Sequence, residues 1–348
     1  MTPNWLVIRS HRLPLSFRLH YRVPGLLLLL GILTLGILVF SVSYGEYAVP
    51  PLDVVRTILR LPTDNADYDF IVNTLRLPRS LVALLVGIAF GIAGTITQGI
   101  LRNPLAAPGI IGINAGAALA AVTLIIVLPN VSVSVLPMAA FVGGFAVFAL
   151  IYLMAWNGGA SPIRLVLMGI GFSMMTASIT SILTTFGNIN AVSQALVWLA
   201  GSVYGSSWNE VSALLPWLVV CVPISVALAR DLNVLNLGDE VARSVGSSVE
   251  WRRGILLTIS VALAGAAVST AGTVGFVGFI APHIARRFVG PSHEGLLVTA
   301  AMVGGVLVMM ADLIGRSLFA PIEIPCGLVT SAIGAPYFLF LMMQKRKA

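Results

Sequence analysis

The sequence predicts an all-α fold, a polytopic membrane protein with about ten transmembrane helices and both termini in the cytoplasm. Of the 348 residues, 58% are hydrophobic and only 9% are charged, whereas soluble domains carry about a quarter charged residues. The mean hydropathy is +0.98. Long apolar runs recur along the chain, and one helical crossing of a bilayer needs roughly 20 apolar residues. This composition excludes a soluble enzyme and a disordered chain.

Ten apolar segments supply the predicted helices. The first follows a basic arm, and its length favours an uncleaved helix over a signal peptide. The eighth is short for a full crossing, so we expect it to be broken or tilted. The segments are 24–43, 80–100, 109–128, 135–156, 163–186, 209–229, 252–273, 276–288, 296–317 and 326–343.

The basic residues predict the orientation of these helices. All but five of the 20 lysines and arginines fall on one side of this threading, which the positive-inside rule assigns to the cytoplasm. The chain then divides into a basic cytoplasmic arm (1–23), a single transmembrane domain (24–343) and a basic cytoplasmic tail (344–348). Five arginines fall on the outer side, namely Arg56, Arg60, Arg76, Arg79 and Arg316.

The reactive residue types are sparse. The two cysteines, Cys221 and Cys326, lie in or beside apolar segments, which argues against disulfides. The four histidines lack the spacing of metal ligands. Neither lysine, Lys345 or Lys347, follows a glycine, so the chain has no phosphate-binding G-x-x-x-x-G-K-[ST] loop. The sequence therefore predicts no metal, no cofactor, no enzymatic activity and no nucleic-acid partner, and it places any ATP hydrolysis on a separate subunit.

Two segments on the outer side have unusual composition. In the loop 44–79, Asp53 is expected to cap a short interfacial helix. Arg76 and Arg79 follow in the same loop. Such arginines either snorkel to lipid headgroups or meet a specific anionic partner. The connection 186–208 is rich in Trp and Tyr, and it is predicted to be an interfacial aromatic belt or a short re-entrant helix that closes an outer gate.

The third polar segment is a cytoplasmic insert, 230–251. Leucines recur in its first half, and Gly238 is expected to end one short helix before Asp239 caps the next. Two short amphipathic helices on a chain without an ATP site indicate a docking surface for a motor subunit, with a solvated connector as the alternative.

Five motifs carry a family resemblance. They are R-L-P-R (76–79), Q-G-I-L-R-N-P-L-A-A-P-G (98–109), L-G-D-E-V-A-R-S-V-G (237–246), G-F-V-G-F-I-A-P-H-I-A-R-R (275–287) and E-I-P-C-G-L-V-T-S-A-I-G-A-P-Y-F (323–338). In this order they resemble the permease subunits of type II ABC importers, which take up iron-siderophore complexes, haem or cobalamin. The resemblance covers nearly the whole chain from residue 24 onward. One departure is Cys326, where many relatives carry an aliphatic residue.

The resemblance implies a multi-subunit machine in the bacterial cytoplasmic (inner) membrane. Two permease subunits, identical or related, would enclose the pathway in the lipid, two ATP-binding subunits would attach inside, and a substrate-binding protein would dock outside. Arg76, Arg79 and Arg316 match arginines that meet acidic residues of that binding protein. The ATPase-coupling positions are matched by Leu237, Gly238, Asp239, Glu240, Ala242, Arg243 and Gly246.

Two further side chains need an interpretation. Asp312 and Arg316 are four residues apart, so they lie on one helix face and can pair. Asp312 is therefore expected either to orient Arg316 for docking or to form a purely structural pair with it. His283 is expected to be a structural hydrogen-bonding group near the interface rather than a proton relay.

The sequence leaves the cargo open among a ferric siderophore, which is the commoner cargo of the family, haem and cobalamin. A rival class is an ion-coupled secondary transporter. Such a transporter normally carries intramembrane carboxylates that bind the coupling ion, and here only Asp312 qualifies.

Overall fold

The computed structural model describes residues 5–9, 16–63, 65–128 and 131–344. Most of the predicted basic tail (344–348) and part of the predicted basic arm (1–23) lie outside these residues. The strands are β1 (Trp5–Arg9) and β2 (Ser16–His20), and the α-helices are α1 (Arg22–Ser43), α2 (Pro51–Ile58), α3 (Asp67–Asp69), α4 (Leu77–Leu101), α5 (Ile113–Val127), α6 (Leu136–Ala155), α7 (Pro162–Phe186), α8 (Ile189–Ala200), α9 (Trp208–Ala227), α10 (Ala229–Asn236), α11 (Asp239–Ser244), α12 (Val249–Ala271), α13 (Val277–Val289), α14 (His293–Ser317) and α15 (Cys326–Gln344).

The long helices fit the predicted membrane architecture in part. Within the described residues, 8 helices are long and apolar enough to cross a membrane: α1, the continuous helix Asp67–Leu101, α6, α7, α9, α12, α14 and α15. Each of the ten predicted segments contains a helix, but α5 has only 15 residues and α13 only 13. The shortness of α13 agrees with the prediction. The sequence did not predict the shortness of α5, which begins late because Gly112 adopts φ 85° after a 3-10 turn, Pro108–Ile111.

The described part of the predicted arm contains a feature that an all-α prediction does not include. β1 and β2 pair as an antiparallel hairpin in which Trp5 lies opposite His20. The chain then enters α1 at Arg22. The rest of the described fold is helical apart from an isolated bridge between Trp156 and Ala160.

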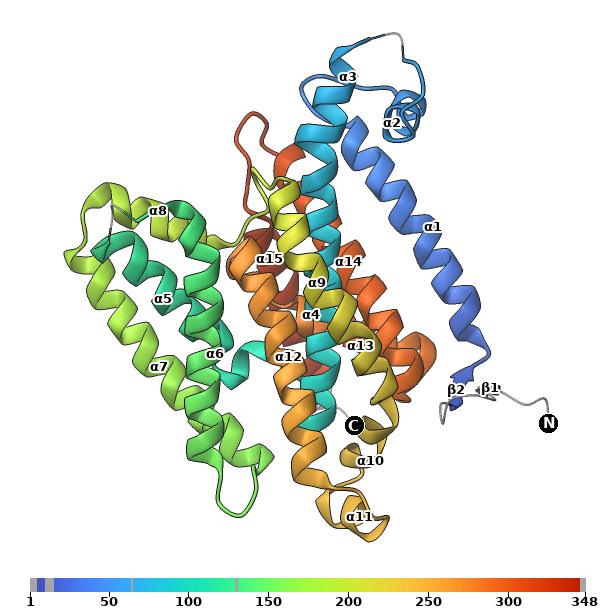
Figure 1. Cartoon of the computed structure of the whole chain (residues 1–348), viewed down its shortest axis with the longest axis vertical. Coiled ribbons are helices and arrows are strands. Elements are labelled where there is room, and N and C mark those ends of the chain that lie inside the picture. The colour runs from blue at the N-terminus through green and yellow to red at the C-terminus, as the bar shows by residue number, and fades with distance from the viewer. Residues whose placement is uncertain (1–4, 10–15, 64, 129–130, 345–348) are drawn as a thin grey trace.

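α4 lies at the centre of the bundle and packs against α14, α12, α13 and α9 (Figure 1). Its glycines allow close contact with α14, because a Cβ at Gly87 would collide with the carbonyl of Gly304 and one at Gly91 would collide with that of Ala300. In lipid, small residues of this kind let helix backbones approach where no hydrophobic force drives them together. The two helices run antiparallel. Gly87 and Gly91 therefore serve the packing of α4 against α14.

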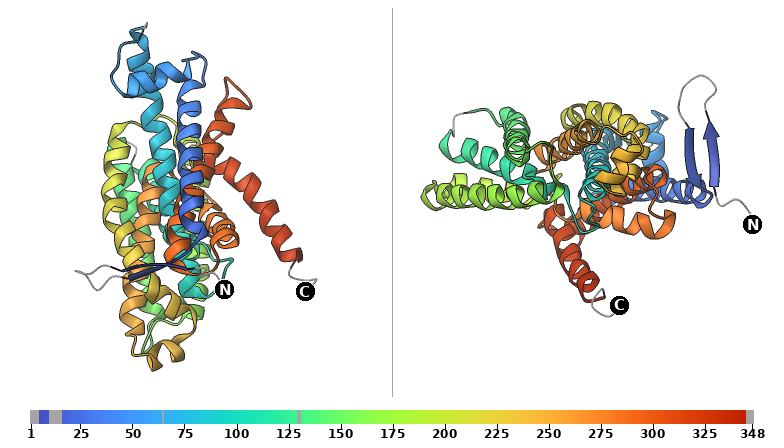
Figure 2. Two further views of the ribbon diagram at one scale, coloured as in Figure 1. Left: turned by 90° about the vertical axis from the view of Figure 1, so that its right-hand side faces the viewer. Right: turned by 90° about the horizontal axis from the view of Figure 1, so that it is seen from below.

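The helices α5 to α8 form a second group beside this central bundle (Figure 1). α15 leaves the bundle at an angle (Figure 2, left). α2 and α3 lie at one end of the molecule and α10 and α11 at the other, and we call these the α2 end and the α11 end (Figure 1).

The α2 helix corrects one detail of the prediction. It begins at Pro51, with Pro50 at the capping position. Asp53 therefore lies in the first turn, where it accepts a 3.2 Å hydrogen bond from Arg56. A proline at the start of a helix has the φ angle that the helix needs and lacks only an N–H that would be unpaired there, which explains why the helix starts before Asp53.

Candidate docking sites at the two ends

The predicted outer arginines come together at the α2 end. Arg76 closes the π-helical segment Phe70–Arg76, Arg79 lies in the first turn of α4, and Arg316 lies in the last turn of α14. Because α4 and α14 are antiparallel neighbours, the start of one helix meets the end of the other. Helix packing thus joins residues that are distant in sequence.

Arg79 is the centre of this cluster. Its Nη2 lies 2.7 Å from Oδ1 of Asp312, and its Nε donates to the same oxygen at 3.1 Å. Its Nη2 also lies 2.9 Å from Oε2 of Glu323 on the α14–α15 connection. A guanidinium bound to a carboxylate through two N–H groups forms a strong and well-oriented pair. Asp312 is buried, at 3% exposure, so this pair is a fixed part of the fold.

Arg76 and Arg316 bind the carboxyl end of α1. Arg76 donates to the carbonyls of Val42 at 2.9 Å and Tyr47 at 2.7 Å. Arg316 donates to the carbonyl of Tyr44 at 3.1 Å and to the carbonyl and hydroxyl oxygens of Ser41. The last carbonyls of a helix have no partner within the helix and carry partial negative charge. The two arginines therefore cap α1.

The predicted pairing of Asp312 with Arg316 is present, with 3.8 Å between Oδ2 and Nε. The shortest ion-pair contact of Asp312, however, is with Arg79. Arg316 is held more closely by α1 than by Asp312. The sequence spacing found the weaker contact because it reveals only pairs on one helix.

The aromatic connection predicted as a belt or a gate contains the helix α8. After α8, Tyr204 places its ring 5.5 Å from the guanidinium carbon of Arg79, within the range of a cation–π contact. Trp208 donates a 2.8 Å hydrogen bond from Nε1 to the carbonyl of Asn73. Both aromatic residues thus contact the segment that carries the arginines.

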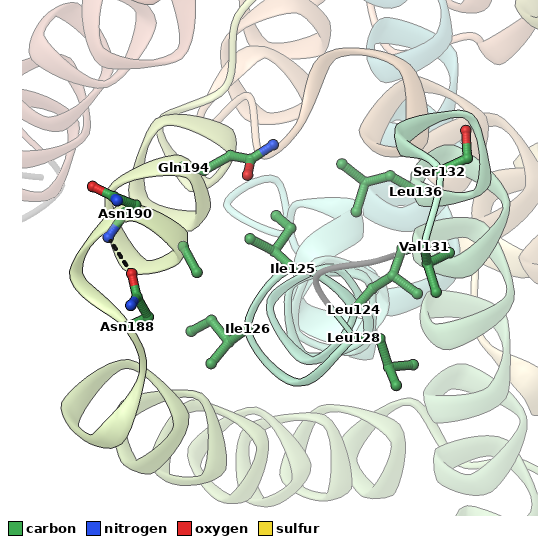
Figure 3. Close-up of a pocket in the computed structure, with 11 residues that line it drawn as sticks. Leu124, Ile125, Ile126, Leu128, Val131, Ser132, Leu136, Asn188, Asn190 and Gln194 are labelled. Carbon is green, nitrogen blue, oxygen red and sulfur yellow. Dashed lines mark hydrogen bonds between the residues drawn. The ribbon is translucent and has the colours of Figure 1, made fainter.

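Two adjacent cavities lie next to this cluster. The larger, of about 630 Å³, is lined by residues of α8, the α8–α9 connection, the end of α12 and the α14–α15 connection. The smaller, of about 410 Å³, lies between α5 and α8. In Figure 3, apolar α5 side chains line the smaller cavity, and Asn188 accepts a 2.9 Å hydrogen bond from the backbone of Asn190. Gln194 lines both cavities. Sequence patterns did not reveal these spaces, because they form between distant segments.

At the α11 end, the insert forms the two predicted short helices, α10 and α11. Gly238 separates them with φ 115°. Asp239, one of the predicted ATPase-coupling positions, pairs with Nη2 of Arg253 at 2.7 Å and with Nη2 of Arg102 at 3.5 Å. Arg253 is 2% exposed. Asp239 therefore anchors α11 to the bundle.

An apolar row on the insert faces solvent. Leu237 is 67% exposed, Val241 45% and Val245 67%. The predicted position Ala242 is buried, whereas Glu240 is exposed. The four-residue spacing of the row places its members on one face of α11 and its flanks. That spacing is visible in the sequence and adds Val241 and Val245 to the candidate coupling residues.

A polar contact joins α10 to α14. Asn233 accepts a hydrogen bond from the backbone N–H of His293 at 2.9 Å, and its Oδ1 lies 2.7 Å from Nδ1 of the same residue. It donates to Oε2 of Glu294 at 2.7 Å. Arg230 lies 3.9 Å from the other oxygen of Glu294. The first turn of α14 is therefore tied to the insert.

The remaining candidates are simpler. The ring of His283 lies 5.7 Å from that of Tyr337 in a T-shaped contact. Cys221 and Cys326 are free and buried. Among the described residues, no group of three or more His, Cys, Asp or Glu side chains is arranged to hold a metal ion.

Comparison with known proteins places these features in a wider context. Residues 32–344 match the model of the FecCD transport family. The chain is 45% identical over 92% of its length to YfhA of Bacillus subtilis, named as a siderophore transport system permease protein, and covers 95% of it. It is 42% identical over 95% of its length to the achromobactin transport system permease protein CbrC of Dickeya dadantii, again covering 95% of the relative. A solved chain, described as an inward-facing conformation of a metal-chelate type ABC transporter, matches with a TM-score of 0.83 and 30% identity, over 92% of this chain and 99% of that one.

Proposed function

The chain belongs to the FecCD transport family, a family of ABC-importer permeases, and we propose that it carries a ferric siderophore across the bacterial cytoplasmic membrane in an ATP-driven importer. In this assembly it pairs with a second permease subunit, identical or related. Two ATPase subunits bind inside, and a substrate-binding protein docks outside. Permeases of this kind are not themselves enzymes.

One observation carries this proposal: two candidate docking surfaces of different character lie at opposite ends of the α4–α14 pair. The α2 end carries the arginine cluster, in which Arg79 and Arg316 are largely buried and paired within the chain. The α11 end exposes the apolar row Leu237, Val241 and Val245. A cationic cluster suits acidic residues of a soluble binding protein. An exposed apolar row on short helices suits a groove in an ATPase.

The orientation follows from these surfaces. We assign the α2 end to the outside and the α11 end to the cytoplasm, with both termini inside and ten crossings. In this arrangement α5 and α13 cross the membrane together with the segments that flank them. Most of the chain's arginines then lie on the cytoplasmic side, as the positive-inside rule requires.

Transport would proceed by alternating access. ATP binding closes the ATPase pair, the insert 230–251 transmits this movement to α14 and α12, and the outer and inner sides open in turn. Cargo selection then resides mainly in the binding protein.

The cargo assignment is supported by the relative named as a siderophore permease. The rival reading as an ion-coupled transporter is disfavoured, because Asp312 is bound by Arg79 at 2.7 Å instead of being open to a coupling ion.

Reconstitution into lipid vesicles tests both the assignment as an ABC importer and the cargo. Vesicles are prepared with the permease alone and with its ATPase and binding protein, and uptake of radioiron siderophores, haem and cobalamin is measured. We expect siderophore uptake only with all components and ATP. Uptake by the permease alone under a proton gradient would overturn the ABC assignment, and ATP-dependent uptake of haem or cobalamin but not of any siderophore would overturn the cargo.

A further inference from the structure

Arg79 forms two unequal ion pairs. The Asp312 side chain is 4% exposed and accepts from both Nε and Nη2 of Arg79. The Glu323 side chain is 33% exposed and lies on a connection between helices, not within one. Arg79 contacts both oxygens of Glu323 as well, through Nη1 at 3.2 Å and Nη2 at 2.9 Å, so the two pairs differ in burial and not in the number of contacts. An exposed ion pair contributes little to stability, whereas breaking a buried one is costly. Of the two carboxylates, Glu323 is therefore the one that is easily exchanged.

The same guanidinium joins two walls of the larger cavity. Glu323 and Tyr204 both line the space of about 630 Å³. Glu323 comes from the α14–α15 connection and Tyr204 from the α8–α9 connection, and each contacts Arg79. While both contacts persist, the two connections are tied together beside the cavity. If they were released, the connections would be free to separate.

We propose that the Arg79–Glu323 pair is a latch on the outer side, which a carboxylate of the binding protein opens by taking the place of Glu323. The exchange keeps the charge on Arg79 balanced, because one carboxylate replaces another. Asp312 holds Arg79 in place throughout. Docking thereby releases the α14–α15 and α8–α9 connections and opens the cavity to the arriving metal chelate.

This latch rests on the proposed function, and it makes a specific prediction about Glu323. In the wild-type protein, Glu323 competes with the binding protein for Arg79. The Glu323→Gln variant removes the competing charge without changing the size of the side chain. It should bind the binding protein more tightly and should open the cavity without it. A residue that merely supported the docking surface would have the opposite effect on affinity.

The test uses the assembled permease–ATPase complex in lipid nanodiscs, with the siderophore-binding protein that supports uptake in the reconstituted vesicles. The first measurement is the dissociation constant of that binding protein. The second is the labelling rate, by a membrane-impermeant maleimide, of a Ser202→Cys probe in the wall of this cavity. Both native cysteines are buried, so the probe reports on the cavity.

For Glu323→Gln we expect binding about three- to tenfold tighter and, in the absence of binding protein, labelling several-fold faster than in the undocked wild type. Glu323→Asp, which keeps the charge, should stay closer to wild type. The matched control is Glu46→Gln, which makes the same charge change at an exposed acid on the α1–α2 connection, and it should leave both values unchanged.

Weaker binding by Glu323→Gln, or affinity and labelling both within twofold of the Glu46→Gln control, would overturn the latch. The two proposals fail separately. If the wild-type complex shows no ATP-dependent uptake, the proposed function is wrong and the latch falls with it. If uptake is normal and Glu323→Gln behaves like the control, only the latch is wrong. Labelling of the permease alone needs no partner, so it decides the question even where binding is too weak to measure.

Discussion

Ion pairs at the α11 end join Arg253, Asp239, Glu250 and Arg243 into one cluster. Its two arginines differ sharply in how far they are exposed. Arg253 is 2% exposed and holds Asp239 at 2.7 Å and the carbonyl of Ala160 at 2.7 Å. Arg243, in the same cluster, has a side chain 58% exposed and pairs with Glu250 at 3.2 Å. Removing one member of a buried pair leaves its partner uncompensated, whereas an exposed pair contributes little. The two arginines should therefore differ in their effect on stability.

We predict that Arg253→Met lowers the stability of the permease by about 2 to 4 kcal/mol, at the lower part of the range for buried pairs because Asp239 keeps Arg102 and some water. Arg243→Met should cost no more than about 1 kcal/mol. Thermal unfolding of the two variants in one detergent measures the difference. Equal melting temperatures of the two variants would show that the buried Arg253 pair contributes no more to stability than the exposed Arg243 pair.

Sequence spacing reveals ion pairs within one helix but not ion pairs between distant segments. The Asp312–Arg316 pair was predictable because its members are one helical turn apart. The stronger pair of Asp312 with Arg79 joins residues 233 positions apart, and the pair of Arg79 with Glu323 joins residues 244 positions apart. Such contacts depend on which helices become neighbours, and one sequence does not contain that information in local form.

Among the short helices, α10 has a defined mechanical connection. Asn233 bridges α10 to His293 and Glu294 in the first turn of α14. Both residues are buried, at 2% and 5% exposure. A buried polar bridge with its groups paired is rigid. When α10 moves, the first turn of α14 should therefore move with it.

We predict that Asn233→Ala uncouples the two helices. In reconstituted vesicles, the number of chelates imported per ATP hydrolysed should fall several-fold, while ATP hydrolysis without binding protein continues. The control, Asn236→Ala, alters an exposed asparagine one turn away on the same helix and should leave this ratio unchanged. A variant that melts earlier but keeps the wild-type ratio would show that the bridge is only structural.

The features of the short helices that could be predicted are those with a local cause in the sequence. α10, Gly238 and α11 were predicted because apolar spacing and a helix-ending glycine are local signals. The predicted cap was wrong by one residue, because Gly238 occupies the capping position and Asp239 lies in the first turn of α11. The pairing of Asp239 was not predicted, because its partner Arg253 belongs to another helix. Likewise, the apolar composition of 109–128 concealed the backbone break at Gly112, which shortens α5.

The molecule as a whole is organised around α4 and α14. α14 has 25 residues and is about 37 Å long at 1.5 Å per residue. It carries the Asn233 contact at its first turn and Asp312 and Arg316 near its end. α4 binds it along this length and holds Arg79 against Asp312. The two helices therefore connect the two proposed docking surfaces through side-chain contacts, Asn233 with His293 and Glu294 at one end and Arg79 with Asp312 at the other.

This arrangement depends on backbone contact between the helices, so it predicts opposite signs for two Gly→Ala changes. At Gly87, the new methyl group would meet the carbonyl of Gly304, and overpacking of this kind costs about 1 to 3 kcal/mol. At Gly36 in α1, no atom lies within 4 Å of the new methyl group, so the change gains up to about 1 kcal/mol from helix propensity. Thermal unfolding should show Gly87→Ala below wild type and Gly36→Ala at or above it.

Because Gly87→Ala would push α14 away from α4, it should also weaken docking of the binding protein at Arg79, two helical turns away. If Gly87→Ala were as stable as Gly36→Ala, with docking unchanged, the α4–α14 contact could not be the rigid link between the two ends.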